Sequence, residues 1–167
     1  MKKGFTLIEL VIVISIILMG SFGFANYVSY QEKVRLSTGA RYLVDLLQQA
    51  RSQAVNVELP TGCTYDSYVG SGIAVDAANN LLYNIIILCP TQQTIRSESL
   101  AAYSHVVFDA SSLGTVIYFD KFYGKAHITG SQLCFKSSAF SPNNYAVISI
   151  TDSWALSLKE NKSDCNP

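Results

Sequence analysis

The feature that most constrains this chain is an apolar run near its N-terminus, from Phe5 to Ala25, in which Glu9 is the only charged residue. At about 1.5 Å per residue, a helix of this length measures about 30 Å and can cross the hydrocarbon core of a bilayer. The run is longer than the apolar stretch of a secretory signal peptide, and Lys2 and Lys3 precede it. We therefore predict a membrane-spanning helix over residues 5–26, with the two lysines inside and the bulk of the chain outside.

Glu9 is difficult to reconcile with a simple membrane anchor. A carboxylate at membrane depth costs at least about 2.5 to 3.5 kcal/mol on insertion scales. An acidic residue that persists at such a position is expected to have a partner or a function.

The stretch around Glu9 reads Lys2-Lys3-Gly4-Phe5-Thr6-Leu7-Ile8-Glu9-Leu10. It resembles the processing motif of type IV prepilins and type II secretion pseudopilins. The resemblance implies that a membrane-embedded prepilin peptidase removes residues 1–4 by cutting after Gly4, and then methylates the new amino group of Phe5. That amine, still cationic, could neutralise Glu9 of a neighbouring subunit in an apolar filament core.

The helix is predicted to continue over residues 27–58, where the pattern of apolar residues becomes amphipathic. Apolar residues spaced three and four apart share one helical face: Leu36, Ala40, Leu43, Leu47, Ala50 and Ala54. Asn56, Pro60 and Gly62 are expected to end the helix. We expect one helix from Phe5 to about Val57, roughly 80 Å long, whose second half packs against a globular head.

The head, residues 59–167, has the alternating or continuous apolar runs of β-strands. Strands are expected at residues 68–75, 81–88, 105–108, 116–119, 132–135, 145–150 and 155–158. Turns are predicted at Asn79-Asn80, before Tyr145 and at Asp152-Ser153, and the first of these joins two strands as a hairpin. The fold class is therefore α+β, and the resemblance implies a type IV pilin-like fold: a long helix packed on an antiparallel sheet.

A second set of residues lies at the end of the helix and in the head: Arg41, Leu43, Leu46, Leu47 and the run from Ala50 to Val55, then Ile117 to Asp120, Gly124 and the hairpin from Tyr145 to Leu158. These residues resemble the corresponding parts of GspH/FimT proteins, which are minor, tip-proximal subunits. This resemblance implies a subunit that helps to initiate or cap a type IV pilus or a type II secretion pseudopilus. Its partners would be other pilins or pseudopilins, the prepilin peptidase, and an inner-membrane platform driven by a cytoplasmic ATPase.

Two other roles stay open at this stage. A major subunit often has a C-terminal region bounded by a disulfide, which Cys134 and Cys165 could delimit. A tip module for adhesion or DNA uptake would place its specificity in loops of the head. The parent machine, whether pilus, type II secretion system or competence apparatus, is not determined by the sequence.

The four cysteines lie in the part of the chain predicted to be outside the cell membrane. No CxxC pair and no nearby histidine gives them zinc-ligand spacing, so disulfides in an oxidising compartment fit better than a metal site. Four cysteines can pair in three ways. We favour Cys63 with Cys89 and Cys134 with Cys165, because the Asn79-Asn80 hairpin carries Cys89 back toward the end of the helix.

No constellation of catalytic residues is apparent, and we expect neither an enzyme nor a cofactor. The only histidines, His105 and His127, lack metal-ligand spacing, and no GxSxG, HExxH or phosphate-binding loop is present. In residues 119–125, aromatic residues interleave with Lys121 and Lys125, as in some nucleic-acid surfaces. We favour a hairpin turn with core aromatics there, because FimT-like DNA-uptake subunits carry an arginine-bearing tail, whereas this C-terminus has only Lys159 and Lys162.

Overall fold

The computed structural model describes residues 6–103, 105–130, 132–138, 144–151, 155–162 and 164–165, without the side chains of residues 19–26 and 161. Gly4 and Phe5, the predicted Asp152-Ser153 turn and most of the turn before Tyr145 lie outside these residues.

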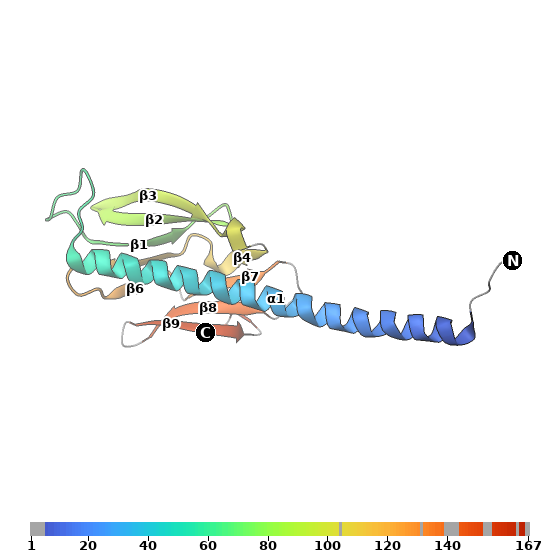
Figure 1. Ribbon diagram of the computed structural model, residues 1–167. Coiled ribbons are helices and arrows are strands. Elements are labelled where there is room, and N and C mark those ends of the chain that lie inside the picture. Colours follow the sequence, from blue (N-terminus) through green and yellow to red (C-terminus); the bar gives the residue numbers. More distant parts are fainter. Residues whose placement is uncertain are drawn as a thin grey trace.

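One long helix, α1 (Leu7–Asn56), forms the spine of the molecule. Its 50 residues correspond to about 75 Å, close to the predicted length. The helix ends where predicted, because Val57 adopts a left-handed conformation and donates its N–H to the carbonyls of Gln53 and Ala54. The half of α1 that carries the N-terminus projects beyond the head, while the other half lies against it (Figure 1).

The predicted apolar stripe of α1 is confirmed as its packing face. All six of its residues are buried: Leu36, Ala40, Leu43, Leu47, Ala50 and Ala54. Burial of this face removes the apolar surface of the helix from water, which is the main stabilisation available to an amphipathic helix.

Nine strands form two antiparallel sheets in the described part of the head. The first sheet has the order β3-β2-β1-β5-β6, with β1 (Gly70–Val75), β2 (Leu82–Cys89), β3 (Thr91–Ser99), β5 (Val116–Asp120) and β6 (Ala126–Ile128). The second has the order β4-β7-β8-β9, with β4 (Val106–Phe108), β7 (Leu133–Ser137), β8 (Tyr145–Ile150) and β9 (Leu156–Lys162). Two short 3-10 helices, Leu100–Tyr103 and Ala110–Ser112, flank β4.

Helix α1 lies across both sheets, against β1 and β5 of the first and β7, β8 and β9 of the second (Figure 1). One core therefore joins all three layers, with Ile73, Phe119, Phe135 and Ile148 packed around the helix. The α+β class and the antiparallel head are as predicted.

Each predicted strand has a counterpart, and the predicted hairpin joins β1 to β2. Two strands, β3 and β6, were not predicted. β3 pairs with β2 along its whole length, yet its first seven residues are exposed and polar except for Ile95, so the sequence has no alternation there. β6 has only three residues, too few for a pattern.

Candidate functional site

The start of α1 places Glu9 in the first helical turn. Thr6 caps the helix, and its Oγ1 accepts a hydrogen bond from the Glu9 backbone N–H at 3.4 Å. Thr6 and Glu9 occupy the two positions of a capping box, a sequence signal for the start of a helix. No described residue bonds to the Glu9 carboxylate, so the acid that lacked a partner in the sequence also lacks one within the described part of the subunit.

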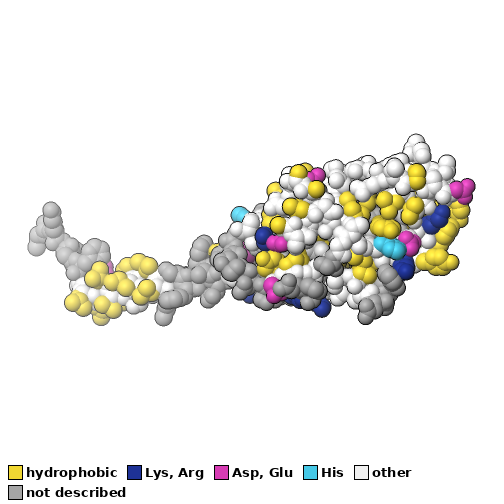
Figure 2. Space-filling model, turned by 180° about the vertical axis from the view of Figure 1, so that it is seen from behind, with side chains coloured by type: hydrophobic (Ala, Val, Ile, Leu, Met, Phe, Trp, Pro, Cys, Tyr) yellow, Lys and Arg dark blue, Asp and Glu magenta, His cyan; other side chains and the backbone are white. Residues whose placement is uncertain are grey.

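The projecting half of α1 exposes apolar side chains in every direction around its axis. Leu7, Ile8, Leu10 and Val11 are all more than half exposed, and the pattern continues to Leu18. Figure 2 shows these side chains as a hydrophobic cluster on the projecting end of the molecule. A helix that is apolar all round is stable only where apolar surroundings cover it.

Within the residues that the structure describes, no helix is both long and apolar enough to cross a membrane. The transmembrane assignment of residues 5–26 therefore stays a prediction.

Polar side chains join α1 to the second sheet, at the end of the apolar core that is nearer the projecting half of the helix. Glu32 is only 5% exposed, and its two carboxylate oxygens have different partners. Oε1 pairs with Nη1 of Arg35 at 2.9 Å, and Oε2 accepts a hydrogen bond from Ser137 on β7 at 3.0 Å. Two turns further along, Glu160 on β9 accepts hydrogen bonds from Ser37 and Arg41 of α1. These contacts fix the position of the second sheet along the helix.

The structure pairs the cysteines as favoured from the sequence. Cys63 is joined to Cys89 with their Cα atoms 5.9 Å apart, which ties the loop after α1 to the end of β2. Cys134 is joined to Cys165 with their Cα atoms 6.0 Å apart, which ties the C-terminal segment to β7.

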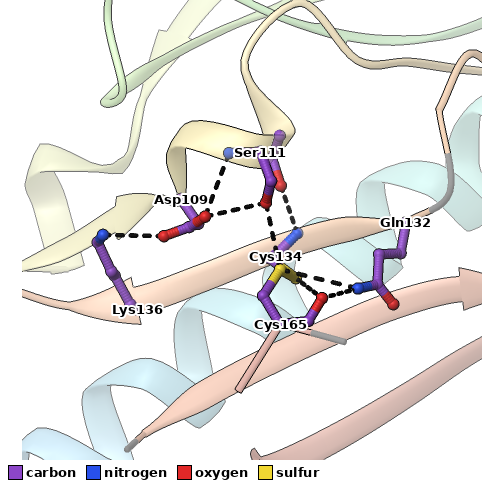
Figure 3. Close-up of a disulfide and its surroundings, with 7 residues drawn as sticks. Asp109, Ser111, Gln132, Cys134, Lys136 and Cys165 are labelled. Carbon is purple, nitrogen blue, oxygen red and sulfur yellow. Dashed lines mark hydrogen bonds and ion pairs between the residues drawn. A yellow bond between two sulfur atoms is a disulfide. The ribbon is translucent and has the colours of Figure 1, made fainter. Parts of the chain in front are cut away.

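Hydrogen bonds surround the second disulfide (Figure 3). Gln132 donates to the carbonyl of Cys165, and Ser112 accepts a hydrogen bond from the backbone N–H of Cys134 at 2.7 Å. Nearby, Lys136 donates to Asp109 at 2.8 Å. Burial by itself raises the pKa of Asp109, but the hydrogen bonds from Lys136 and Ser111 outweigh it and hold that pKa below its usual value.

A second polar cluster lies at the edge of the first sheet, where two tyrosines share one carboxylate. Tyr83 and Tyr42 both donate to Oε2 of Glu98, at 2.5 and 3.0 Å. The hydrogen bond from Tyr83, together with the one from Tyr42 and the charge of Arg96, lowers the pKa of Glu98. Burial and the same carboxylate raise the pKa of Tyr83.

The interpretation of residues 119–125 as a hairpin with core aromatics is correct in part. The segment is the β5–β6 hairpin and Phe119 is fully buried, but Phe122 is 45% and Tyr123 84% exposed. Phe122 has a φ of 70°, a left-handed conformation that turns the chain away from the core. Sequence alone gave no sign of this conformation, because glycine or asparagine is the usual residue there.

The two histidines lie in different environments. The ring of His127 stacks on Tyr118 with centroids 4.8 Å apart, and its Nε2 lies 2.8 Å from Oδ2 of Asp120. His105 is an exposed residue with a φ of 69°, just before β4. Within the described ranges, no three histidine, cysteine or acidic side chains gather as a metal site would require.

The chain matches no curated protein and no solved structure. Residues 1–25, which include Gly4, Phe5 and Glu9, match the family model of the prokaryotic N-terminal methylation motif. This motif indicates a type IV pilin-like protein.

Proposed function

We propose that the chain is a minor pilin or pseudopilin, a structural subunit that helps to initiate or cap a type IV pilus-like filament or a type II secretion pseudopilus. The observation that carries this proposal is the projecting half of α1, apolar on all sides with one unpartnered carboxylate, Glu9, in its first turn. Such a segment needs apolar surroundings and a cation from another molecule. A bilayer supplies the surroundings before assembly, and the helices of neighbouring subunits supply them afterwards.

Processing would create the missing cation. Cleavage after Gly4 frees the amino group of Phe5, and methylation leaves that group positively charged. No described residue bonds to the Glu9 carboxylate, so it is available to a cation from another subunit. The amine of one subunit would therefore pair with Glu9 of the next, which joins two buried charges that are each costly alone.

The same proposal gives the location and partners of the subunit. Residues 5–26 would cross the inner membrane with the N-terminus in the cytoplasm, and the disulfide-bonded head would lie outside, where disulfides persist. The prepilin peptidase, an inner-membrane platform and other pilin-like subunits would act on it in turn.

Two alternative roles each have one observation in their favour. The Cys134–Cys165 disulfide encloses β8 and β9, as in the disulfide-bounded region expected of a major subunit. Quantification of the chain in purified filaments separates the roles, since a major subunit would dominate the mass. A tip-binding role is favoured by the exposed aromatic side chains of the β5–β6 hairpin.

Three variants test whether Glu9 acts between subunits. Glu9→Ala removes the whole carboxylate group, Glu9→Gln removes only its charge, and Thr6→Ala removes only the Thr6 cap. We expect normal processing and stable monomer for all three. Crosslinking to partner pilins should be lost in both Glu9 variants, because stranding one partner of a buried ion pair costs about 3 to 5 kcal/mol. Thr6→Ala should crosslink like the unmodified sequence.

The opposite ranking would contradict the proposal. If Thr6→Ala fails to crosslink while Glu9→Gln succeeds, the first turn needs its cap and the charge is irrelevant. Processing has its own test: Gly4→Leu should leave an uncleaved precursor, because a side chain at that position blocks the approach of the peptidase to the backbone. Intact-mass measurement decides this independently of assembly.

A further inference from the structure

The end of the head farthest from the N-terminus carries a group of exposed aromatic side chains. Tyr65, in the loop after α1, contacts Lys121 and Phe122 of the β5–β6 hairpin. Tyr123 follows in the same hairpin and is 84% exposed, and we call these four residues the tip patch. The hairpin lies against the last turns of α1, since Gly124 is next to Val55 and Arg51. Figure 1 shows this end of α1 opposite the projecting half, and Figure 2 shows hydrophobic and basic side chains together on that end of the head.

The tip patch is held in place by contacts between its two segments. The ammonium of Lys121 lies 5.5 Å from the ring centroid of Tyr65 and 5.7 Å from that of Phe122. It also donates a hydrogen bond to the carbonyl of Tyr65 at 3.2 Å. The Cys63–Cys89 disulfide anchors the loop two residues before Tyr65. The rings of Tyr65 and Phe122 are therefore preorganised, which lowers the entropic cost of binding a ligand.

The exposure of these rings is unfavourable for the free protein. Tyr65 is 52% exposed, and the left-handed conformation of Phe122 adds backbone strain to the exposure of its ring. Gly124, also left-handed, lets the hairpin approach α1 closely, since a Cβ there would lie 2.8 Å from Cγ2 of Val55. The turn thus holds the Phe122 side chain toward solvent at a cost in folding free energy, which contacts with a bound ligand would offset.

The size of the tip patch argues against a protein partner. If a Tyr or Phe side chain presents about 200 Å² when fully exposed, the three rings together offer roughly 350 to 400 Å². A stable protein interface needs about 800 Å² from each partner. The patch is therefore large enough for a few small rings and too small for a folded domain.

The charges at this end argue against nucleic acid. The basic and acidic residues near the tip patch are equal in number: Arg51, Lys121 and Lys125 against Glu58, Asp66 and Asp120. The whole chain also has a formal net charge of zero. Binding to a phosphate backbone depends on an excess of basic groups, which releases counterions. A polyhydroxylated ligand needs no such excess, because mixed acidic and basic side chains can both bond to its hydroxyl groups.

We propose that the tip patch binds a carbohydrate chain, with sugar rings stacked on the exposed faces of Phe122 and Tyr123 and hydroxyl groups bonded to neighbouring charged side chains. Tyrosine, which combines an apolar ring with a polar hydroxyl, is well suited to such contacts. The site lies where the end of a capping subunit would face outward. Binding by the purified chain does not depend on the filament role, so the two proposals can fail separately.

The test uses the full chain purified in detergent micelles, probed on an array of defined oligosaccharides and then titrated with the strongest ligand. We expect at least one oligosaccharide to bind, with Tyr123→Ala and Phe122→Gly weakening the affinity about tenfold or more. Tyr30→Ala removes a similarly exposed tyrosine from α1, outside the tip patch, and should leave the affinity unchanged. The thermal midpoint of Phe122→Gly should not fall, which separates loss of binding from loss of folding.

Three outcomes would overturn the proposal. The first is a chain that binds no oligosaccharide on the array. The second is binding that survives both tip-patch variants or is lost equally in Tyr30→Ala. The third is salt-sensitive binding of a single-stranded oligothymidylate that depends on the tip patch without any oligosaccharide binding, which would identify a nucleic-acid site instead.

Discussion

Ser137, on β7, donates a hydrogen bond of 3.0 Å to Oε2 of Glu32, on α1, across a separation of 105 residues. Both side chains are buried, so this contact fixes the second sheet to the helix at a point where water cannot compete. It lies near the boundary between the packed and projecting halves of α1. Any force transmitted between the head and the projecting half of α1 would pass through this region.

Removal of the Ser137 hydroxyl should destabilise the head measurably. Ser137→Ala leaves a buried carboxylate oxygen without this donor, at an expected cost of about 1 to 3 kcal/mol in the free energy of unfolding. Ser37→Ala is the matched control, because Ser37 donates to Glu160, a carboxylate that is 25% exposed and also contacts Arg41. Urea unfolding followed by circular dichroism compares them, and equal losses in the two variants would contradict a special role for the buried contact.

Each disulfide should contribute substantially to stability. For Cys63–Cys89, which are 26 residues apart, the loop-entropy relation gives about 3.5 kcal/mol, so the double variant Cys63→Ser/Cys89→Ser should unfold at much lower urea concentration. Non-reducing peptide mapping checks the pairing directly. A fragment that joined Cys89 to Cys134 would show that the connectivity is wrong.

The sequence predicted those parts of the fold in which one local pattern determines burial. The apolar stripe from Leu36 to Ala54 predicted the packing face of α1, and the hairpin between β1 and β2 followed from its turn residues. Strand β3 was not predicted, because its polar residues are held by pairing with β2 and not by a buried face. The burial of Glu32 was not predicted, because its partner Ser137 lies 105 residues away in sequence and is brought to it by tertiary packing.

The same distinction between local sequence and tertiary packing applies to the two candidate sites. The motif around Gly4, Phe5 and Glu9 is contiguous in sequence, so a resemblance could identify it without a structure. The tip patch joins Tyr65 to Phe122 through a fold that brings two loops together, and its outward orientation depends on a left-handed residue. No periodic pattern encodes either property.

Acid should weaken the fold partly through Glu98. Because the hydrogen bond from Tyr83 lowers the pKa of Glu98 below its unfolded value of about 4.3, Glu98 stabilises the fold above that pH. The stabilisation is lost as the pH falls through the lower, folded-state pKa. Glu98→Gln should therefore be less stable than the unmodified chain at pH values near neutrality, but should lose less stability on acidification.

Tyr83→Phe provides the second arm of that experiment. It removes the phenol that donates to Glu98 and should cost about 1.5 to 3 kcal/mol near neutral pH, as for a hydrogen bond to a charged group. Since both variants remove one interaction, the double variant should cost less than the sum of the two. Urea unfolding over a range of pH measures this, and full additivity would show that the pair is not coupled.

The backbone strain at Phe122 gives a prediction whose sign is diagnostic. A non-glycine residue in the left-handed region costs about 1 to 2 kcal/mol, and Phe122 has a φ of 70°. Phe122→Ala removes the ring and keeps the strain, whereas Phe122→Gly removes both. The glycine variant should therefore be more stable than the alanine variant by about 1 kcal/mol, after the entropic cost of glycine is subtracted.

Tyr123, the next residue, is the matched control because it is also exposed and does not have a positive φ. At position 123 the order should reverse, with Tyr123→Gly less stable than Tyr123→Ala by about 0.5 to 1 kcal/mol. Urea midpoints for the four variants provide the comparison. If glycine is the weaker replacement at both positions, the hairpin relaxes without strain, and the outward orientation of Phe122 has no energetic cost for a ligand to offset.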